Sequence, residues 1–292
     1  MIIVRLKGGL GNQMLQYAAG KAAALRCGSQ LKLDVSNLYS KITNDTPRFY
    51  ELDAFKLEAE IATEKELQKI NPPFKKLFRK IFRKITGKNY LVCDPDILKA
   101  RDNSYLEVVW PCEKYFADFR EQIFSDFQLK KPLSQSGQSI KEKILKSKNS
   151  ISIHLRRGDY ASHKTYKSWH GLCSPSYYQK AVDYILNETK AETKKAPVVF
   201  VFSDEIEWAK NNLILPAELT EIVYVSDEKI PAYEEIHLMS LCHHHVIANS
   251  TFSWWGAWLD PKSAKIVVAP RQWVADSSVD TKDVLPNTWV SL

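Results

Sequence analysis

The chain has 292 residues, of which 45% are hydrophobic and 26% are charged. This composition is typical of a soluble globular protein of about two domains, because single cores stop growing near ~250–300 residues. No apolar run approaches the ~20 residues that a transmembrane helix needs. The formal charge of +7 is concentrated in residues 74–88, which hold seven basic residues and no acid. The rest of the chain is neutral, which argues against a nucleic-acid-binding domain.

The N-terminal segment predicts a strand, a glycine-rich turn and a helix. Ile2–Leu6 is apolar, the turn Gly8–Gln13 follows, and apolar residues then recur at helical spacing as far as Leu25. A second strand is predicted at Gln30–Asp34, and this alternation indicates a parallel, Rossmann-like sheet. Since the chain starts on a strand and its five cysteines show no paired spacing, we expect a cytoplasmic location rather than export.

The turn between these elements is a candidate site for polar recognition. Backbone N–H groups at a helix start can face an anion or a sugar hydroxyl, and the side chains of Asn12 and Gln13 lie beside Gly9. A dinucleotide-binding fingerprint is incomplete, because Met14 stands where the third glycine would be, although Asp34 ends the next strand. The alternative interpretation is a tight turn that serves helix–sheet packing.

Residues 74–88 predict a basic amphipathic helix inserted in the first domain. Such a helix can lie on an anionic bilayer, or it can dock its apolar face on the protein core as an ordinary surface helix. Further on, we expect a strand at Leu106–Trp110 and a polar linker from Lys130 to Ser150. The boundary predicted in this linker gives an N-terminal domain at 1–148 and a C-terminal domain at 149–292.

The second half of the chain repeats the strand–helix rhythm. Ser174-Pro175 suits the N-cap and first position of a helix, and a second helix is predicted from Glu234 to Cys242. One predicted strand begins at Ser150 and leads into the charged residues that start at His154. The others are Val198–Phe202, Ile222–Val225, Val246–Ala248 and Lys265–Ala269. The fold class expected is therefore α/β, with two Rossmann-like domains in tandem.

Charged residues gather at the end of the strand that begins at Ser150. This strand ends in the imidazole of His154, and Arg156, Arg157 and Asp159 follow. Open α/β sheets bind ligands at the carboxyl ends of their strands, so this edge predicts an anion site. Neighbouring arginines on an extended chain face opposite ways, and we expect Arg156 to meet the ligand. The alternative is an internal cluster of ion pairs that holds a loop.

Two further segments are predicted at the same edge. Asp204 ends the next strand, where it could accept two hydrogen bonds from a guanine edge or cap the following helix. Residues 249–258 place hydroxyls and amides at a strand-to-helix turn, which suits a phosphate-binding nest. The tryptophans of this segment could stack on sugars, but their helical spacing favours burial against the sheet. They are Trp254, Trp255 and Trp258.

No metal site is expected. Cys242 and the three histidines after it are consecutive, so their side chains diverge and do not converge easily on one ion. Asp94 and Asp96 have the spacing of a chelating pair, but a helix-capping turn is the preferred interpretation.

Taken together, the turn at 8–13, the run His154–Asp159 and the segment 249–258 resemble glycosyltransferase family 11, the α-1,2-fucosyltransferases. The resemblance runs from Ile3 to about Pro270, with the motifs in the family's order. It implies a GT-B-like fold of two Rossmann-like domains facing a central cleft, with the donor mainly on the second. It also implies inverting transfer of fucose from GDP-fucose to the 2-hydroxyl of a terminal galactose, without a metal or other cofactor.

The resemblance also implies roles for single residues. Arg156 would hold the donor's pyrophosphate with His154 beside it, and Asp204 would contact guanine. Asn12, with Gly9 and Gln13, would close over the donor from the first domain. The residues expected around the phosphates and the base are Ser250, Thr251, Phe252 and Ser253.

The catalytic base stays open between two interpretations. Asp159 is the acid nearest to Arg156 in sequence and could accept the proton of the attacking hydroxyl. It could instead pair with an arginine, in which case the proton leaves late or goes to a phosphate oxygen.

The expected partners are GDP-fucose and a galactose-terminated oligosaccharide or glycolipid, with no nucleic acid and with peripheral contact to an anionic membrane through residues 74–88. A GDP-fucose-dependent transferase with another acceptor or linkage would share the donor residues. A non-enzymatic glycan-binding protein, which reads sugars with its tryptophans, would bind sugars without GDP.

Overall fold

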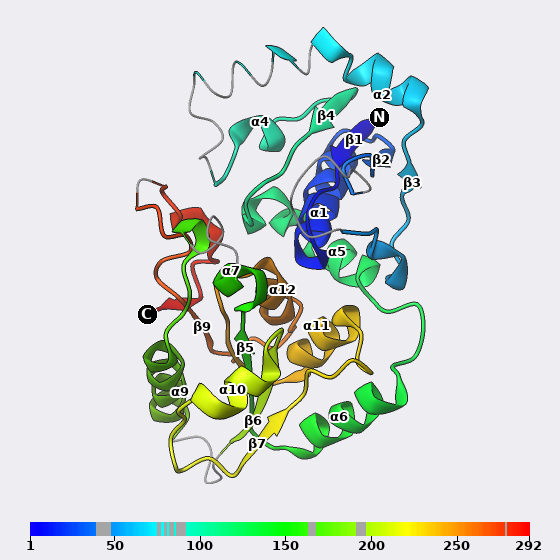
Figure 1. Cartoon of the computed structure of the whole chain (residues 1–292). Helices are drawn as coiled ribbons and strands as arrows, with labels where there is room; N and C mark the ends of the chain where they lie inside the picture. The colour runs from blue at the N-terminus through cyan, green and yellow to red at the C-terminus, as the bar shows by residue number, and fades with distance from the viewer. Residues whose placement is uncertain are drawn as a thin grey trace. The chain divides into compact units, whose positions relative to one another are not determined.

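A computed structural model of the chain describes residues 1–38, 48–74, 77–78, 81, 85, 92–162, 168–190, 197–277 and 279–292, without the side chains of residues 159 and 162. The chain forms two compact units, each with its own sheet (Figure 1). The first unit comprises Met1–Lys131 and Val279–Pro286, and the second comprises Pro132–Ser278 and Asn287–Leu292.

The first unit is built on a parallel sheet with the strand order β3-β2-β1-β4. Its strands are β1 (Ile2–Arg5), β2 (Leu31–Asp34), β3 (Glu60–Ile61) and β4 (Ser104–Leu106). The strand predicted at Leu106–Trp110 is wrong in its bounds, because β4 lies earlier and pairs Ser104–Leu106 with β1. Tyr105 donates its hydroxyl to the carboxylate of Asp34 across the sheet, which holds β4 in this register.

Helix α1 (Leu10–Arg26) packs on this sheet through a nearly continuous buried surface. Gly20 lies where helix and sheet meet most closely, because a Cβ atom there would be 2.9 Å from side-chain atoms of Val4 and Leu31. A glycine inside a helix costs about 0.5–1 kcal/mol relative to alanine, and here it permits the close approach. The other α-helices of this unit are α2 (Glu64–Ile70), α4 (Pro95–Leu98) and α5 (Arg120–Asp126).

The unit also contains short 3-10 turns, namely η1 (Leu52–Ala54), η3 (Glu113–Tyr115), η4 (Ala117–Phe119) and η5 (Lys282–Val284). Asp94 caps α4 by accepting a hydrogen bond from the N–H of Asp96. The preferred interpretation of this acid pair, a helix-capping turn, is therefore confirmed.

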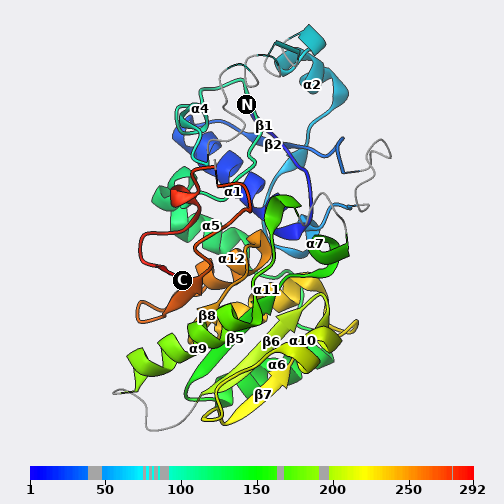
Figure 2. The same ribbon diagram turned by 60° about the vertical axis from the view of Figure 1, so that its left-hand side comes forward.

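The second unit carries a six-stranded parallel sheet with the order β10-β9-β8-β5-β6-β7. Figure 2 shows β5, β6 and β7 side by side with helices on the faces of the sheet. The strands are β5 (Ser150–Leu155), β6 (Val198–Ser203), β7 (Glu221–Tyr224), β8 (His244–Val246), β9 (Val267–Ala269) and β10 (Val290–Ser291). The helices are α6 (Gln135–Lys146), α7 (Gly158–Ser162), α9 (Pro175–Thr189), α10 (Ile206–Asn212), α11 (Ala232–Leu241) and α12 (Thr251–Trp258).

The strand order reverses between β5 and β8, because the chain runs outward through β6 and β7 and then returns to the other side of β5. In open α/β sheets, ligands bind outside the carboxyl ends of the strands at such a switch point. The α/β class and the two parallel-sheet units are thus as predicted. Ser174 also caps α9, with Pro175 at the start of that helix, as expected.

Side chains of β5 alternate between two layers. Ile151, Ile153 and Leu155 belong to the apolar core shared with α9 and α10. Ser152 and His154 point to the other layer, where Ser152 meets His245 and the ring of His154 meets that of Phe252. Period-two alternation therefore gives this fully buried strand one polar face.

The predicted polar linker is a helix over most of its length. Helix α6 begins at the N-cap Ser134, whose hydroxyl accepts a hydrogen bond from the N–H of Gly137. The carboxylate of Glu234 on α11 accepts hydrogen bonds from both the N–H and the hydroxyl of Ser134, at 2.8 and 2.7 Å. These contacts place α6 against α11 within the second unit, after the change of unit at Lys131.

Residues 74–88 fall only partly within the described chain. The positions of all seven basic residues lie outside it, whereas Phe74, Leu77, Phe78 and Ile81 are helical and 49–70% exposed. These four apolar side chains line an open groove. A surface helix docked on the protein core would bury its apolar face, but these four side chains are exposed. Among the described residues, no helix is long and apolar enough to cross a membrane.

Candidate functional site

The carboxyl edge of β5 brings several predicted site residues together. Arg156 lies just beyond the strand, and Nη1 of its guanidinium is 3.0 Å from Oδ2 of Asp204, which follows β6. The other carboxylate oxygen of Asp204 accepts a hydrogen bond from the N–H of Arg157 at 2.9 Å. The two strand ends are thus joined through Asp204, as parallel pairing of β5 with β6 requires.

Gly158 makes this junction sterically feasible. A Cβ atom at residue 158 would lie 2.7 Å from Oδ2 of Asp204, which is closer than real Cβ atoms approach other atoms. The glycine after the arginine pair therefore leaves room for the carboxylate that binds Arg156.

The two adjacent arginines have different surroundings. The guanidinium of Arg157 lies 3.6 Å from the ring centre of Trp208 and donates to Glu205 at 3.2 Å. Cation–π stacking and a charged hydrogen bond hold it against α10. Arg156 lies at 5.3 Å from the ring centre of Tyr160 and retains 23% side-chain exposure.

His154 presents a buried polar atom that has no protein partner among the described residues. Its side chain is 4% exposed, and its Nδ1 atom makes no hydrogen bond. Burial, with a smaller contribution from the charge of Arg156, lowers the pKa of His154 to about 3. The imidazole is therefore neutral at physiological pH. Buried polar groups are rarely left unpaired, so this atom points to a polar ligand.

The start of α12 supplies the other side of the switch point. Ser250 is the N-cap, and its hydroxyl accepts a hydrogen bond from the N–H of Phe252 at 3.3 Å. Ser253 is buried and donates to the carbonyl of Ser250, whereas Thr251 and Phe252 are half-buried. The ring of Phe252 lies 5.3 Å from that of His154. Helix α12 thus directs its N-terminus to the edge that carries Arg156, where a partial positive charge favours an anion.

Asn249 anchors this turn to the following loops. Its amide donates to the carbonyls of His170 and Trp273 at 2.7 and 3.2 Å. Trp254, Trp255 and Trp258 are at most 1% exposed. Their predicted burial is confirmed, and sugar stacking on these three rings is not compatible with it.

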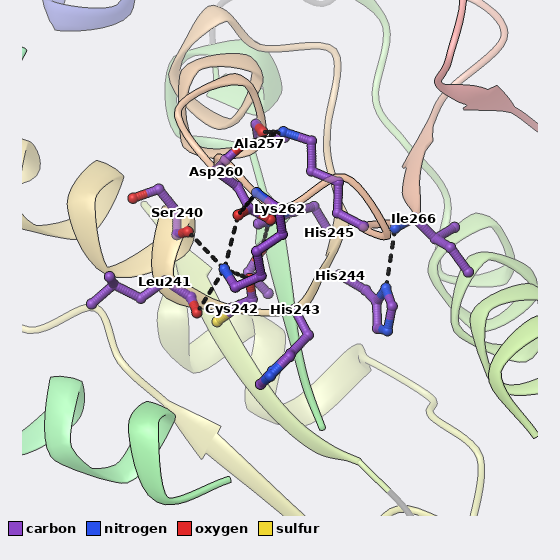
Figure 3. A network of polar contacts seen from close by, with 12 residues as sticks. Ser240, Leu241, Cys242, His243, His244, His245, Ala257, Asp260, Lys262 and Ile266 are labelled. Carbon is purple, nitrogen blue, oxygen red and sulfur yellow. Dashed lines mark hydrogen bonds and ion pairs between the residues drawn. The ribbon is translucent and has the colours of Figure 1, made fainter. Parts of the chain in front are cut away.

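The three consecutive histidines have different hydrogen-bond partners. Figure 3 shows His244 beside Ile266 and the network around Asp260. Nδ1 of His243 pairs with Ser150, and Nδ1 of His244 accepts from the N–H of Ile266. His245 lies between the hydroxyl of Ser152 at 2.8 Å and Oδ2 of Asp260 at 3.0 Å. The side chains diverge as the sequence predicts, and the described residues contain no cluster that could hold a metal ion.

Lys262 completes this network. Its ammonium group donates to Oδ1 of Asp260 at 2.8 Å and to the carbonyls that end α11. Burial lowers the pKa of His245 despite the nearby carboxylate. Burial by itself would raise the pKa of Asp260, but the bonds from His245 and Lys262 outweigh it and lower this pKa. His245 is therefore neutral, and Asp260 is ionised.

Glu235 is an acid at this edge that the sequence analysis did not single out. It lies in the first turn of α11, hydrogen-bonds to Ser226 and feels the charge of Asp204. The signal that could have identified it is its place: an acid in the first turn of a helix that follows a predicted strand lies at the carboxyl edge of the sheet.

The glycine turn of the first unit leads into helix α1. Gly9 is the N-cap of α1 and approaches the guanidinium of Arg48. Gln13 is fully buried, and its amide group bonds to the backbone of Gly8, Phe49 and Glu51. These contacts use the amide of Gln13 inside the unit.

The start of α1 also has an internal anion. The carboxylate of Glu51 accepts a hydrogen bond from the N–H of Leu10, and burial raises the pKa of this acid. The side chain of Asn12 lies close to Gly8, because a Cβ atom at Gly8 would be 2.6 Å from Nδ2 of Asn12. The remaining predicted residue, Asp159, belongs to α7, but its side chain lies outside the described part of the chain.

This chain matches two bacterial relatives over almost its whole length. It is 30% identical over 306 residues to an α-1,2-colitosyltransferase of Escherichia coli, covering 100% of this chain and 99% of that protein. It is 33% identical over 310 residues to the O-antigen biosynthesis glycosyltransferase WbnK of the same species, covering 98% and 99%. A galactoside α-(1,2)-fucosyltransferase 1 of Leontopithecus chrysomelas is 28% identical over 160 residues, covering 51% of this chain and 41% of that protein.

Solved structures give a weaker likeness. The α-1,6-fucosyltransferase NodZ soaked with GDP-fucose aligns over 89% of this chain and 92% of that one, with a TM-score of 0.49 and 17% identity. Such values carry no information on substrate. The sequence profile described as Glycosyl transferase family 11 matches residues 1–292. With the motifs at 8–13, 154–159 and 249–258 all inside the match, the chain belongs to glycosyl transferase family 11.

Proposed function

We propose that this glycosyltransferase transfers fucose from GDP-fucose, with inversion, to the 2-hydroxyl of a terminal galactose. The oxygen of that hydroxyl attacks the anomeric carbon from the face opposite GDP. The bond between this carbon and the phosphate oxygen breaks, and its electron pair leaves with GDP. The proton of the hydroxyl goes to a carboxylate or to a phosphate oxygen.

The observation that carries the proposal is the anion site at the switch point of the second unit. Arg156 and the N-terminus of α12 meet there, with the unpaired Nδ1 of His154 beside them. GDP leaves with growing negative charge, and a guanidinium with backbone N–H groups stabilises such charge. Support for the sugar and the linkage comes from the α-1,2 transferases among the relatives.

We further propose that the reaction needs no metal ion, because the guanidinium of Arg156 and the N–H groups at the start of α12 supply positive charge at this edge. Asp159 stays a candidate base on its sequence position alone.

The test is incubation of the full chain with GDP-fucose, EDTA and a panel of β-galactosides, with products read by mass and by linkage. An α-1,2-linked fucosyl product formed in the presence of EDTA is expected. A product with another linkage would replace the acceptor assignment, and activity that returns only with a divalent ion would refute metal independence.

Arg156→Ala tests the site. Removal of a preorganised donor to a transition-state anion typically costs ~10²–10³-fold in kcat. We expect a loss of this size with an unchanged unfolding midpoint. Turnover near that of the wild type would refute the assigned role.

A second donor is favoured by one observation, the whole-chain match to a colitosyltransferase. GDP-colitose in the same assay separates the two donors: a higher kcat/KM with GDP-colitose than with GDP-fucose would replace fucose as the transferred sugar.

We also propose peripheral contact with an anionic membrane through residues 74–88. The exposed apolar side chains at Phe74, Leu77, Phe78 and Ile81 support this, as do the seven bases that the sequence places among them. Flotation with vesicles containing anionic lipid tests it, with Lys75→Glu/Lys76→Glu as the variant and neutral vesicles as the control. No flotation of the wild type with anionic vesicles would refute the contact.

A further inference from the structure

Glu235 lies at the carboxyl edge of the second sheet. Asp204 follows β6 at this edge, and Glu235 follows the neighbouring strand β7. Helix α11, which carries this residue in its first turn, begins soon after β7. The Glu235 carboxyl group is hydrogen-bonded to Ser226. The hydroxyl of Ser226 also accepts the N–H of Ser203, which ends β6, at 2.8 Å. Glu235 is therefore positioned by the ends of β6 and β7, and no basic side chain within the described chain forms an ion pair with it.

Asp204, the acid expected to contact guanine, is engaged differently. One of its oxygens binds the guanidinium of Arg156, and the other accepts the N–H of Arg157. Both contacts tie β5 to β6 and set the direction of Arg156. Glu235, in contrast, forms no ion pair within the described chain, and the hydroxyl of Ser226 holds its carboxyl group.

A second observation points to a ligand in the same layer. The polar side chains of β5 face the layer of α11 and α12, as the contacts of Ser152 with His245 and of His154 with Phe252 show. Nδ1 of His154 is buried without a hydrogen-bond partner in the described structure. Helix α11 packs against α12, so Glu235 and this atom belong to one layer at one edge of the sheet.

We propose that Glu235 reads the nucleobase of the donor by accepting hydrogen bonds from two adjacent N–H groups of guanine. The inference rests on the proposed function, in which the donor is a GDP-sugar. Guanine presents the N1–H and the 2-amino group side by side, and a carboxylate has two oxygens that match this spacing. Asp204 then acts as a positioning residue for Arg156.

The charge state of Glu235 gives the recognition a pH dependence. Burial raises the pKa of this carboxyl to about 7; the Ser226 hydrogen bond opposes the rise and the Asp204 charge adds to it. Helix α12 has no ionisable side chain. The charge of Lys141 on α6 lowers the pKa of His237, which lies further along α11, and the charge of Glu234 raises it. Arg156 forms an ion pair with Asp204.

Free protein is therefore partly protonated at Glu235 near neutral pH. Two N–H donors favour the ionised form, so binding of GDP releases this proton. For a free pKa near 7, this linkage makes GDP bind about tenfold more tightly at pH 8 than at pH 6. The terminal phosphate of GDP titrates near pH 6 as well, so the comparison must be made between protein variants.

The experiment is isothermal titration of the full chain with GDP and with IDP, which lacks only the 2-amino group. For the wild type we expect GDP to bind at least tenfold more tightly than IDP, since a buried carboxylate left without one donor loses a charged hydrogen bond. Glu235→Gln should weaken GDP by about 10–100-fold and bring the two nucleotides within threefold of each other. Glu228→Gln, which removes an exposed charge from the preceding loop, is the matched control and should change neither value.

The number of protons released on binding provides a second readout. Titrations at pH 7 in buffers of different ionisation enthalpy should show that more protons are released with GDP than with IDP, and Glu235→Gln should remove this difference. Equal GDP and IDP affinities in the wild type would overturn the inference. Equal weakening of both nucleotides in Glu235→Gln would also overturn it, because a ribose or phosphate contact predicts that result. Failure of the wild type to bind GDP would instead refute the proposed function.

Discussion

Replacement of Asp260 tests the buried network of His245, Asp260 and Lys262. The carboxylate is fully buried and accepts three hydrogen bonds: two from Lys262 at 2.8 and 2.9 Å, and one from Nε2 of His245 at 3.0 Å. Asp260→Ala leaves a buried imidazole N–H without its acceptor and an ammonium without its counter-charge. The side chain of Lys262 is 37% exposed, so water replaces part of what its ammonium loses, whereas each buried polar group left without a partner costs about 1–3 kcal/mol. We therefore expect a total loss of about 3 kcal/mol.

Asp260→Asn should be much milder. The carbonyl oxygen of the new amide can still accept from Lys262, but its NH₂ group then faces the N–H of His245. The imidazole can relieve this conflict by exchanging its tautomer, so that Nε2 accepts from the new NH₂ group and Nδ1 donates to the hydroxyl of Ser152. We expect a loss of about 1–2 kcal/mol, because a charged acceptor is replaced by a neutral one.

The assay is urea unfolding with nitrogen-15 NMR of His245. The expected result is a clear gap in unfolding midpoint between the two variants and a proton on Nδ1 only in Asp260→Asn. Asp280→Asn is the control, because Asp280 makes the same contacts to the backbone and side chain of Lys282 at the surface; its midpoint should not change. Asp260→Ala within 1 kcal/mol of the wild type, or an unchanged tautomer in Asp260→Asn, would refute the reasoning.

Three further predictions concern stability and the site. The pKa of His154 in the folded chain is about 3, below its ordinary value of 6.5, so the unfolded chain binds a proton that the folded chain does not as pH falls below 6.5. This residue alone should therefore lower the free energy of unfolding by about 2 kcal/mol between pH 7 and pH 5. The measurement is the urea midpoint at the two pH values, which should depend less on pH in His154→Gln. Gly158→Ala should displace Asp204 from Arg156 and cost about 1–3 kcal/mol, with reduced turnover; a wild-type melting temperature would contradict the close approach. Arg157→Ala should lower stability by about 1–3 kcal/mol through loss of its contacts with Trp208 and Glu205, whereas Arg156→Ala should lower turnover, and the reverse pattern would exchange the roles of the two arginines.

The residues that determine β5 were readable from sequence, whereas α6 was not. The run that begins at Ser150 is an apolar and small-residue strand with charge at its end, and β5 occupies this place in the chain. Helix α6 buries Ile144 and Gly137 alone, and the rest of the helix consists mostly of polar and charged residues, a composition that a polar linker shares. Its position depends on Glu234, one hundred residues further along the chain.

Strand β8 shows a second limit. The sequence predicts a strand at Val246–Ala248, but the structure pairs His244–Val246 with β5. Histidines are acceptable inside this sheet because serine hydroxyls of β5 face their rings, as Ser152 faces His245. Such compensation is visible only when the pairing of the strands is known. The same holds for Glu235, which becomes a candidate site residue through its neighbours Ser226 and Asp204.

The chain passes from one unit to the other at three places, after residues 131, 278 and 286. Neither unit is therefore encoded by one continuous stretch of the gene. A truncation after residue 131 would remove η5, whose Val284 is fully buried and whose Asp283 pairs with Lys114 at 2.6 Å. A single proteolytic cut after residue 278 or 286 leaves Met1–Lys131 covalently linked to the main part of the second unit. A cut after residue 131 separates it, and residues 279–286 then hold the two products together only through their packing inside the first unit.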